Sequence, residues 1–126
     1  MPVRPVSFYL PSSSQIKIFF NKNLSSLSVN NFLIKSLTGT SQDLSIESVT
    51  VDKNSVEIKT HPQNARTYYL IELIHNETFP FKSEDNDTLI DDRTSRKIFF
   101  VGAEEFNPIR DRFFSSIPKI YDVNGT

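Results

Sequence analysis

The stretch Arg66-Thr-Tyr-Tyr-Leu-Ile-Glu-Leu-Ile-His75 decides the fold of this chain. In an extended backbone, side chains alternate between two faces, so Tyr69, Ile71 and Leu73 lie together on one side. Leu70 on the other side is apolar as well, and a strand of this kind packs on both faces at least locally. The stretch therefore predicts a central β-strand with residues 69, 71 and 73 buried.

The whole chain has the length and composition of one soluble domain. Its 126 residues include 11 Phe and no Trp, which predicts a core filled with phenylalanine rings. A formal net charge of −1 gives no general attraction to nucleic-acid phosphate or to an anionic membrane surface. No run of residues is apolar for long enough to span a bilayer. We therefore expect neither nucleic acid nor a membrane as a partner.

The chain contains no cysteine, and its start does not resemble a secretory signal. The lack of cysteine excludes disulfides, thiolate nucleophiles and zinc sites built on Cys. Residues 1–5 lead directly into a strand-like segment, without the apolar core that a signal peptide needs. We therefore expect a chain that is made in the cytoplasm and is not exported by that route.

Alternation of apolar and polar residues predicts six more strands, at residues 6–10, 15–20, 29–35, 44–51, 56–59 and 96–101. The first lies between Pro5 and Pro11, and because proline cannot donate to a β-ladder we expect it at a sheet edge. The apolar phase changes near residues 47 and 48, which predicts a β-bulge. A polar turn at residues 52–55 predicts a hairpin.

The tail differs in composition from the rest, so we divide the chain into a domain at residues 1–103 and a docking segment at residues 104–126. Asn107 and Pro108 favour the start of a short helix, and Pro118 would end it. Its apolar residues could bind a partner as a helix binds in a groove, or could fold back over an open end of the domain. The candidate partner-binding residues are Ile109, Phe113, Phe114, Ile117, Ile120 and Tyr121.

A resemblance to a known class of module appears on the central stretch. The order Pro62, Thr67, Tyr69, Ile71, Leu73 resembles the penultimate strand of fibronectin type III and bacterial Ig-like modules. In those modules a tyrosine begins the strand and alternating aliphatic residues follow. The resemblance implies an all-β fold, an Ig-like β-sandwich with a short C-terminal helical or extended tail.

An earlier part of the chain carries the same resemblance. Gln15-Ile-Lys-Ile-Phe-Phe-Asn-Lys-Asn-Leu24, followed by Val29-Asn-Asn-Phe32, is similar to the second strand and loop of bacterial Ig-like modules. Such modules occur as repeats in surface proteins and in phage virion proteins. The resemblance covers about residues 3–102. The chain departs from it at residues 76–94, a segment longer than these modules usually have.

The chemistry-bearing residues do not form a recognisable catalytic pattern. No Gly-x-Ser-x-Gly turn and no glycine-rich phosphate loop occurs, and there are only 3 glycines to build either. The two histidines, His61 and His75, lack the paired spacing of a two-histidine metal site. We therefore expect a protein that is not an enzyme and has no cofactor.

An acidic stretch raises the question of calcium binding. Carboxylates at alternate positions in a loop can converge on one ion, but this loop lacks the glycine and the closing glutamate of an EF-hand. A solvated acidic loop is the preferred interpretation. The acidic residues are Glu84, Asp85, Asp87, Asp91 and Asp92.

These observations favour a non-enzymatic structural module in a larger assembly of protein subunits. Our first hypothesis is a phage virion, in the tail, neck or capsid surface, because a cytosolic chain with this kind of module needs a route outward. The alternative is a carbohydrate- or cell-surface-binding adhesion module at the cell surface, which would contact a surface glycan through aromatic side chains. The aromatic residues for that contact are Tyr9, Phe19, Tyr68 and Phe81.

Overall fold

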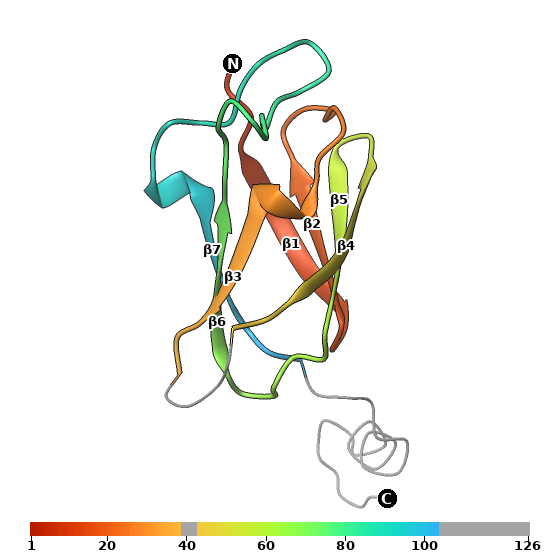
Figure 1. The fold of residues 1–126 in the computed structure, drawn as a ribbon, viewed down its shortest axis with the longest axis vertical. Helices are drawn as coiled ribbons and strands as arrows, with labels where there is room; N and C mark the ends of the chain where they lie inside the picture. The colour runs from red at the N-terminus through yellow and green to blue at the C-terminus, as the bar shows by residue number, and fades with distance from the viewer. Residues whose placement is uncertain (39–42, 104–126) are drawn as a thin grey trace, which may run out of the picture.

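In the computed structural model, which describes residues 1–38 and 43–103, two antiparallel sheets face each other across one core (Figure 1). One sheet has the strand order β1-β2-β5-β4 and the other has the order β3-β6-β7. The predicted all-β sandwich is therefore confirmed, and constant-type immunoglobulin domains have the same arrangement of four and three strands. The strands are β1 (Pro5–Ser12), β2 (Gln15–Phe20), β3 (Phe32–Ser36), β4 (Ile46–Asp52), β5 (Ser55–Thr60), β6 (Tyr68–Leu73) and β7 (Lys97–Val101).

Strand β6 is the central strand of the three-stranded sheet, as the sequence predicts. Tyr69, Ile71 and Leu73 point into the core and are almost fully buried. The ring of Tyr69 stacks on Phe100 of β7, with centroids 5.2 Å apart. Its hydroxyl accepts a hydrogen bond of 2.9 Å from the backbone N–H of Asn64. This contact is the tyrosine corner of immunoglobulin-like sandwiches, and it fixes the loop between β5 and β6.

The four-stranded sheet also agrees with the expected pattern. The proline-flanked strand β1 lies at the edge, and β2 has the predicted bounds with Ile16 and Ile18 buried. The register of β4 against β5 shifts between Ile46 and Ser48, where the sequence predicts a bulge. In the hairpin turn Lys53 adopts a positive φ of 58°, a conformation that tight turns require.

The third strand begins later than predicted. Residues Val29–Asn31 form a 3-10 turn rather than the start of a strand, and β3 starts at Phe32. Ser28 caps this turn by accepting a hydrogen bond from the N–H of Asn30. The buried amide of Asn31 donates to the carbonyls of Ile74 and Phe79, at 2.9 and 2.8 Å. The side chain of Asn31 thus ties the turn to the chain that follows β6.

The long segment at residues 76–94 closes the upper end of the sandwich in Figure 1. Phe81 is fully buried and packs against Phe20 and Phe32, with ring centroids 5.5 and 5.6 Å away. Both sheets contribute to this closure, through Phe20 of β2 and Phe32 of β3, and a parallel bridge joins Leu89 of the segment to Val3 ahead of β1. The segment therefore supplies core residues that shorter modules would lack.

At the lower end, the chain leaves β7 through Gly102. A Cβ atom at this position would stand 2.1 Å from the carbonyl oxygen of Asn64, so only glycine fits. The backbone N–H of Gly102 donates to the carbonyl of Thr67 at 2.8 Å. The described helical segments are two 3-10 turns of three residues each, and neither has the length or hydropathy to cross a bilayer.

Candidate protein-interaction surface

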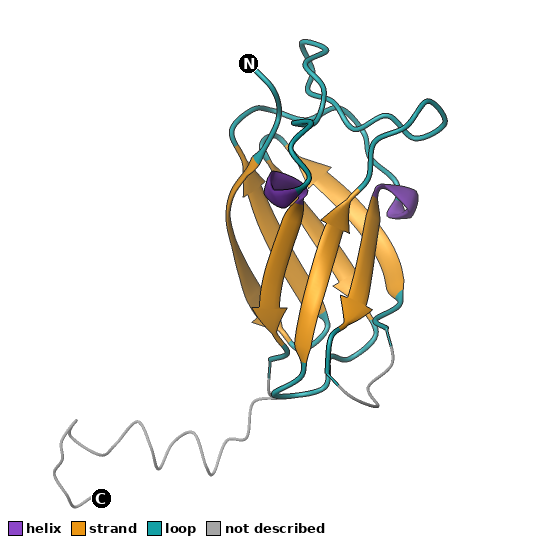
Figure 2. Cartoon of the chain, turned by 90° about the vertical axis from the view of Figure 1, so that its left-hand side faces the viewer, coloured by secondary structure: helices purple, strands orange, loops and turns teal. Residues whose placement is uncertain are grey.

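The outer side of the three-stranded sheet, the sheet nearest the viewer in Figure 2, carries a group of apolar residues. Cross-strand pairing places Leu70 beside Phe99, and Tyr68 beside Val101. Leu37 continues β3 alongside β6, since its N–H donates to the carbonyl of Tyr68 at 2.8 Å. We call this group the apolar face. Its members are Leu33, Leu37, Tyr68, Leu70, Phe99 and Val101.

Most of the apolar face is accessible to solvent. Phe99 is 62% exposed and Tyr68 is 60% exposed, while Leu70 between them is buried by its neighbours. Single exposed apolar residues are common on soluble proteins, but contiguous patches mark sites of association. Aromatic residues are also enriched at the centre of protein interfaces. The apolar face is therefore the strongest candidate interaction surface in the described residues.

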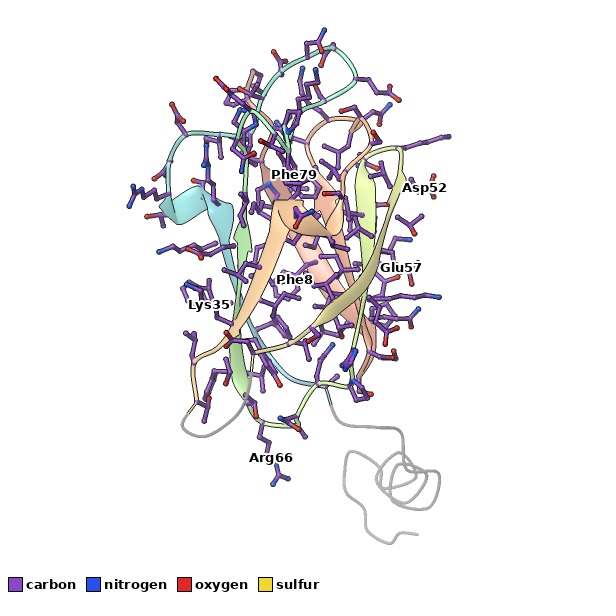
Figure 3. The ribbon with its side chains drawn as sticks, viewed as in Figure 1. Phe8, Lys35, Asp52, Glu57, Arg66 and Phe79 are labelled. Atoms are coloured by element: carbon purple, nitrogen blue, oxygen red, sulfur yellow. The ribbon has the colours of Figure 1, made fainter. Side chains whose placement is uncertain are left out.

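Charged residues adjoin the apolar face at its β3 edge, where Lys35 lies in line with Leu70, and at its upper end. The ammonium of Lys35 lies 3.5 Å from a carboxylate oxygen of Glu72 on the adjacent strand. On the other side of Glu72, Lys97 occupies the opposite position on the adjacent strand β7. Figure 3 shows Lys35 on the outer side of its sheet, away from the core. Exposed ion pairs contribute little stability, so these residues act as a polar rim.

The outer side of the four-stranded sheet is mostly polar, apart from the rings of Tyr9 and Phe19. Gln15 on β2 donates a hydrogen bond of 2.6 Å to Glu57 on β5, which Figure 3 shows on the opposite side of the molecule from Lys35. The outward side chains of β2, β5 and β4 are polar at Gln15, Lys17, Ser48, Thr50, Glu57 and Lys59. This side resembles an ordinary solvated sheet surface.

The four aromatic residues predicted to contact a glycan do not share a face. Tyr9 and Phe19 stack on the outside of the four-stranded sheet, with centroids 6.2 Å apart, and Lys17 lies 5.7 Å above the Phe19 ring. Tyr68 lies on the other sheet, in the apolar face. Phe81 is buried in the core, so its predicted exposure is wrong. Because Phe81 lies in a long polar segment, the sequence suggests that its ring is exposed. In the structure the ring fills the upper end of the sandwich instead.

A groove runs along the side of the sandwich where β1 and β7 lie opposite each other. It has a volume of about 420 Å³, and its lining includes Val6, Phe8, Ile98 and Phe99. Phe99 belongs to both the groove and the apolar face. The apolar surface thus continues around the edge of β7 towards the other sheet.

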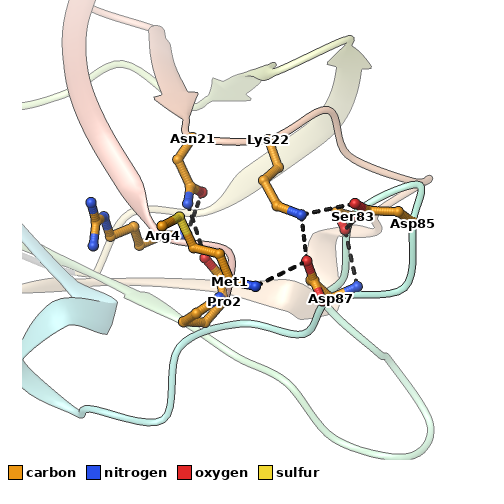
Figure 4. A network of polar contacts seen from close by, with 8 residues as sticks. All are labelled: Met1, Pro2, Arg4, Asn21, Lys22, Ser83, Asp85 and Asp87. Carbon is orange, nitrogen blue, oxygen red and sulfur yellow. Dashed lines mark hydrogen bonds and ion pairs between the residues drawn. The ribbon is translucent and has the colours of Figure 1, made fainter.

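The acidic segment is held by a lysine rather than left to solvent (Figure 4). Lys22 forms ion pairs with Asp85, at 2.8 Å, and with Asp87. Hydrogen bonds from Lys22 and Ser83 lower the pKa of Asp85 to about 2. The same two carboxylates raise the pKa of Lys22. Asp87 also lies 3.4 Å from the N-terminal ammonium, so the network fastens the segment to the start of the chain.

The other candidate ligands are dispersed. Asp91 pairs with Arg96 at 3.4 Å, and Asp92 accepts a hydrogen bond from Ser95. His61 follows β5 at the lower end, whereas the ring nitrogen Nδ1 of His75, after β6 at the upper end, accepts a hydrogen bond from the N–H of Phe81. Within residues 1–38 and 43–103, no three His, Asp or Glu side chains are grouped to hold a metal ion.

The predicted partner-binding residues of the tail lie outside the described residues. This holds for Ile109, Phe113, Phe114, Ile117, Ile120 and Tyr121, whose role stays a prediction. The apolar face itself was not predicted as a site. The available signal was the apolar character of both phases of the two strands, at Leu70 in β6 and at Phe99 and Val101 in β7.

No protein-family model matches the sequence, and no curated protein matches it. Solved structures of a surface layer protein share the fold. A crystal structure of the S-layer protein rSbsC matches with a TM-score of 0.65 and 16% identity, over 80% of this chain and 14% of that chain. The N-terminal part of the bacterial S-layer protein SbsC matches with a TM-score of 0.65 and 17% identity, over 80% of this chain and 23% of that one.

A third structure agrees with these two. Domains 1–6 of the surface layer protein SbsC match with a TM-score of 0.63 and 15% identity, over 82% of this chain and 14% of that chain. At this level of identity, the likeness is one of fold. The present chain spans less than a quarter of the length of each SbsC chain that it matches.

Proposed function

We propose that this chain is a non-enzymatic, Ig-like structural module of a protein assembly at a cell surface. The observation that carries the proposal is the apolar face, which a sandwich of this kind does not need for its own core. The fold supports the proposal because it is shared with domains of surface layer proteins. A module that must hold neighbours in place needs a surface for protein contacts, and the apolar face supplies one.

The polar clusters of the structure support a non-catalytic role. Among residues 1–38 and 43–103, the pKa values of Lys22, Asp85 and Asp87 are shifted, and these groups pair with one another on the surface. Their pKa shifts are explained by this mutual pairing, which joins residues 83–87 to the loop after β2, and by the hydrogen bond from Ser83 to Asp85. The Lys22 network is better explained as a clamp on the segment that closes the core.

The cell surface is preferred here over the virion that the sequence first favoured. The similar structures come from surface layer proteins, and a virion role rests on the sequence resemblance alone. Glycan binding is not proposed, because Tyr9 and Phe19 are separated from Tyr68 by the thickness of the sandwich. The partners in this proposal are therefore protein subunits.

Immunogold electron microscopy tests this proposal directly. An antibody raised against the purified chain is applied to sections of cells that produce the protein naturally, with a deletion strain as the control. Gold particles along the cell envelope are the expected result. Labelling confined to phage particles, or spread through the cell interior, would overturn the proposal.

A further inference from the structure

We propose that the apolar face of one copy binds residues 104–126 of a second copy, so that copies join head to tail. This inference rests on the proposed function and names the partner of the same surface. The face is the acceptor and the C-terminal segment is the donor. Each copy would carry one of each, and a contact between two different surfaces repeats from copy to copy rather than closing as a symmetric pair.

The distribution of exposed apolar residues indicates where the occupant lies. The row of Leu37, Tyr68 and Val101 is at the lower end of the sheet, and all three residues are exposed. The row at the other end contains Glu72 and Lys97 beside Leu33. The surface thus changes from apolar to charged along the strands. A short apolar segment would cover Tyr68, Leu70 and Phe99 in the lower two rows. Lys35, at the β3 edge of the middle row, would keep its ion pair with Glu72 at the rim.

The C-terminal segment has the composition that this surface requires. Its 23 residues follow Ala103 and include six large apolar side chains, the predicted partner-binding residues from Ile109 to Tyr121. Apolar side chains of this kind are stabilised when they are removed from water, and the apolar face offers a surface on which to bury them. An amphipathic segment laid on an apolar surface is a common mode of recognition.

The direction in which the chain leaves the sandwich favours a second copy over the same copy. The N–H of Ala103 donates to the side-chain oxygen of Gln63 at 2.8 Å. Gln63 is buried, and its own N–H donates to the carbonyl of Ser13 in the turn between β1 and β2. Ala103 is therefore drawn beneath the core towards the four-stranded sheet.

Two full-length variants separate the donor from the acceptor. The acceptor variant Tyr68→Thr/Phe99→Thr removes the two most exposed rings of the apolar face while keeping residues that favour strands. The donor variant Phe113→Ser/Ile117→Ser/Ile120→Ser removes apolar side chains from the segment. Matched controls are Tyr9→Thr, an exposed ring on the opposite face, and Asp111→Ser/Arg112→Ser, a charge-neutral change in the segment.

Sedimentation-velocity centrifugation over a concentration series measures the association. The unaltered chain and both controls should form species that grow with concentration. Each variant alone should self-associate at least about 10-fold more weakly than the unaltered chain, because truncating large apolar anchors commonly has this effect. Circular dichroism confirms that each variant keeps its β-structure, so that unfolding is not mistaken for lost binding.

Mixing the two variants is the decisive measurement. The acceptor variant still has an intact segment, and the donor variant still has an intact face, so an equimolar mixture should form one-to-one pairs and nothing larger. A mixture that remains monomeric, or an unaltered chain that is monomeric at every concentration, would overturn the inference. If immunogold particles labelled the cell envelope but the purified chain stayed monomeric, this contact would be refuted and the proposed surface role would still hold.

Discussion

The two outer faces of the sandwich are built on the same pleated framework but differ in chemistry. On the four-stranded sheet the outward residues are mostly polar, and Gln15 and Glu57 join neighbouring strands. On the three-stranded sheet the outward residues of β6 and β7 include Tyr68, Leu70 and Phe99. Both sheets bury the same kind of aliphatic and aromatic core. The fold therefore does not require the outward apolar residues, which points to a contact with another protein.

The largest effect expected from this comparison concerns adjacent positions in β6. Ile71→Ala should lower the free energy of unfolding by about 3 kcal/mol, because it removes core contacts and leaves a cavity. Leu70→Ala should cost about 1 kcal/mol, since water can occupy the vacated space on the outer side. Urea denaturation in dilute solution measures both. Equal costs for the two variants would mean that the apolar face is already covered within a single chain.

A smaller effect is expected at the tyrosine corner, where the two sheets are joined at the lower end. Tyr69→Phe removes the hydrogen bond between its hydroxyl and the N–H of Asn64, and should lower the free energy of unfolding by about 1 kcal/mol. Tyr68→Phe, one residue away on the exposed face, is the control and should change it by less than about 0.5 kcal/mol. Thermal unfolding followed by circular dichroism measures both changes. If the two variants behaved alike, the corner would have no structural role.

The smallest effect compares one carboxylate on each outer face. Glu57→Ala removes a hydrogen bond of 2.6 Å with Gln15, and should lower the free energy of unfolding by about 0.5–1 kcal/mol. Glu72→Ala breaks a looser ion pair with Lys35, 3.5 Å long, and should change it by less than about 0.5 kcal/mol. Chemical denaturation at low and high salt distinguishes them. A larger loss for Glu72→Ala would show that the rim of the apolar face is structural.

Much of the fold follows from period-two patterns in the sequence. The alternation around Tyr69 predicts a buried central strand, and two prolines predict the edge position of β1, because both signals are local properties of the backbone. The bulge near Ser48 is predictable for the same reason, since one extra residue reverses the apolar phase.

Other features depend on contacts between distant parts of the chain. The 3-10 turn before β3 is stabilised by hydrogen bonds from Asn31 to Ile74 and Phe79, more than forty positions away. The burial of Phe81 depends on the space that the two sheets leave at the upper end. The local pattern of residues predicts neither contact. The apolar face was missed because a residue with apolar neighbours in both phases is equally consistent with a buried strand.

The candidate site is thus only half visible from the sequence. The composition of residues 104–126 predicts a docking segment, and that prediction stands untested. The acceptor surface requires the register of three strands, because Leu70 and Phe99 become neighbours only when β6 and β7 pair. The sequence shows which residues are apolar, whereas the register of the sheet shows which of them share one surface.

The bridge between Val3 and Leu89 bears on how the protein is made. On the ribosome, the N-terminal residues emerge long before position 89 has been synthesised. Strand β1 can pair early with β2, but Val3 must wait for its partner until Leu89 has emerged. Contacts between such remote positions form slowly, so we expect the upper end of the sandwich to be completed last. Newly made chains should be most prone to aggregation before that stage.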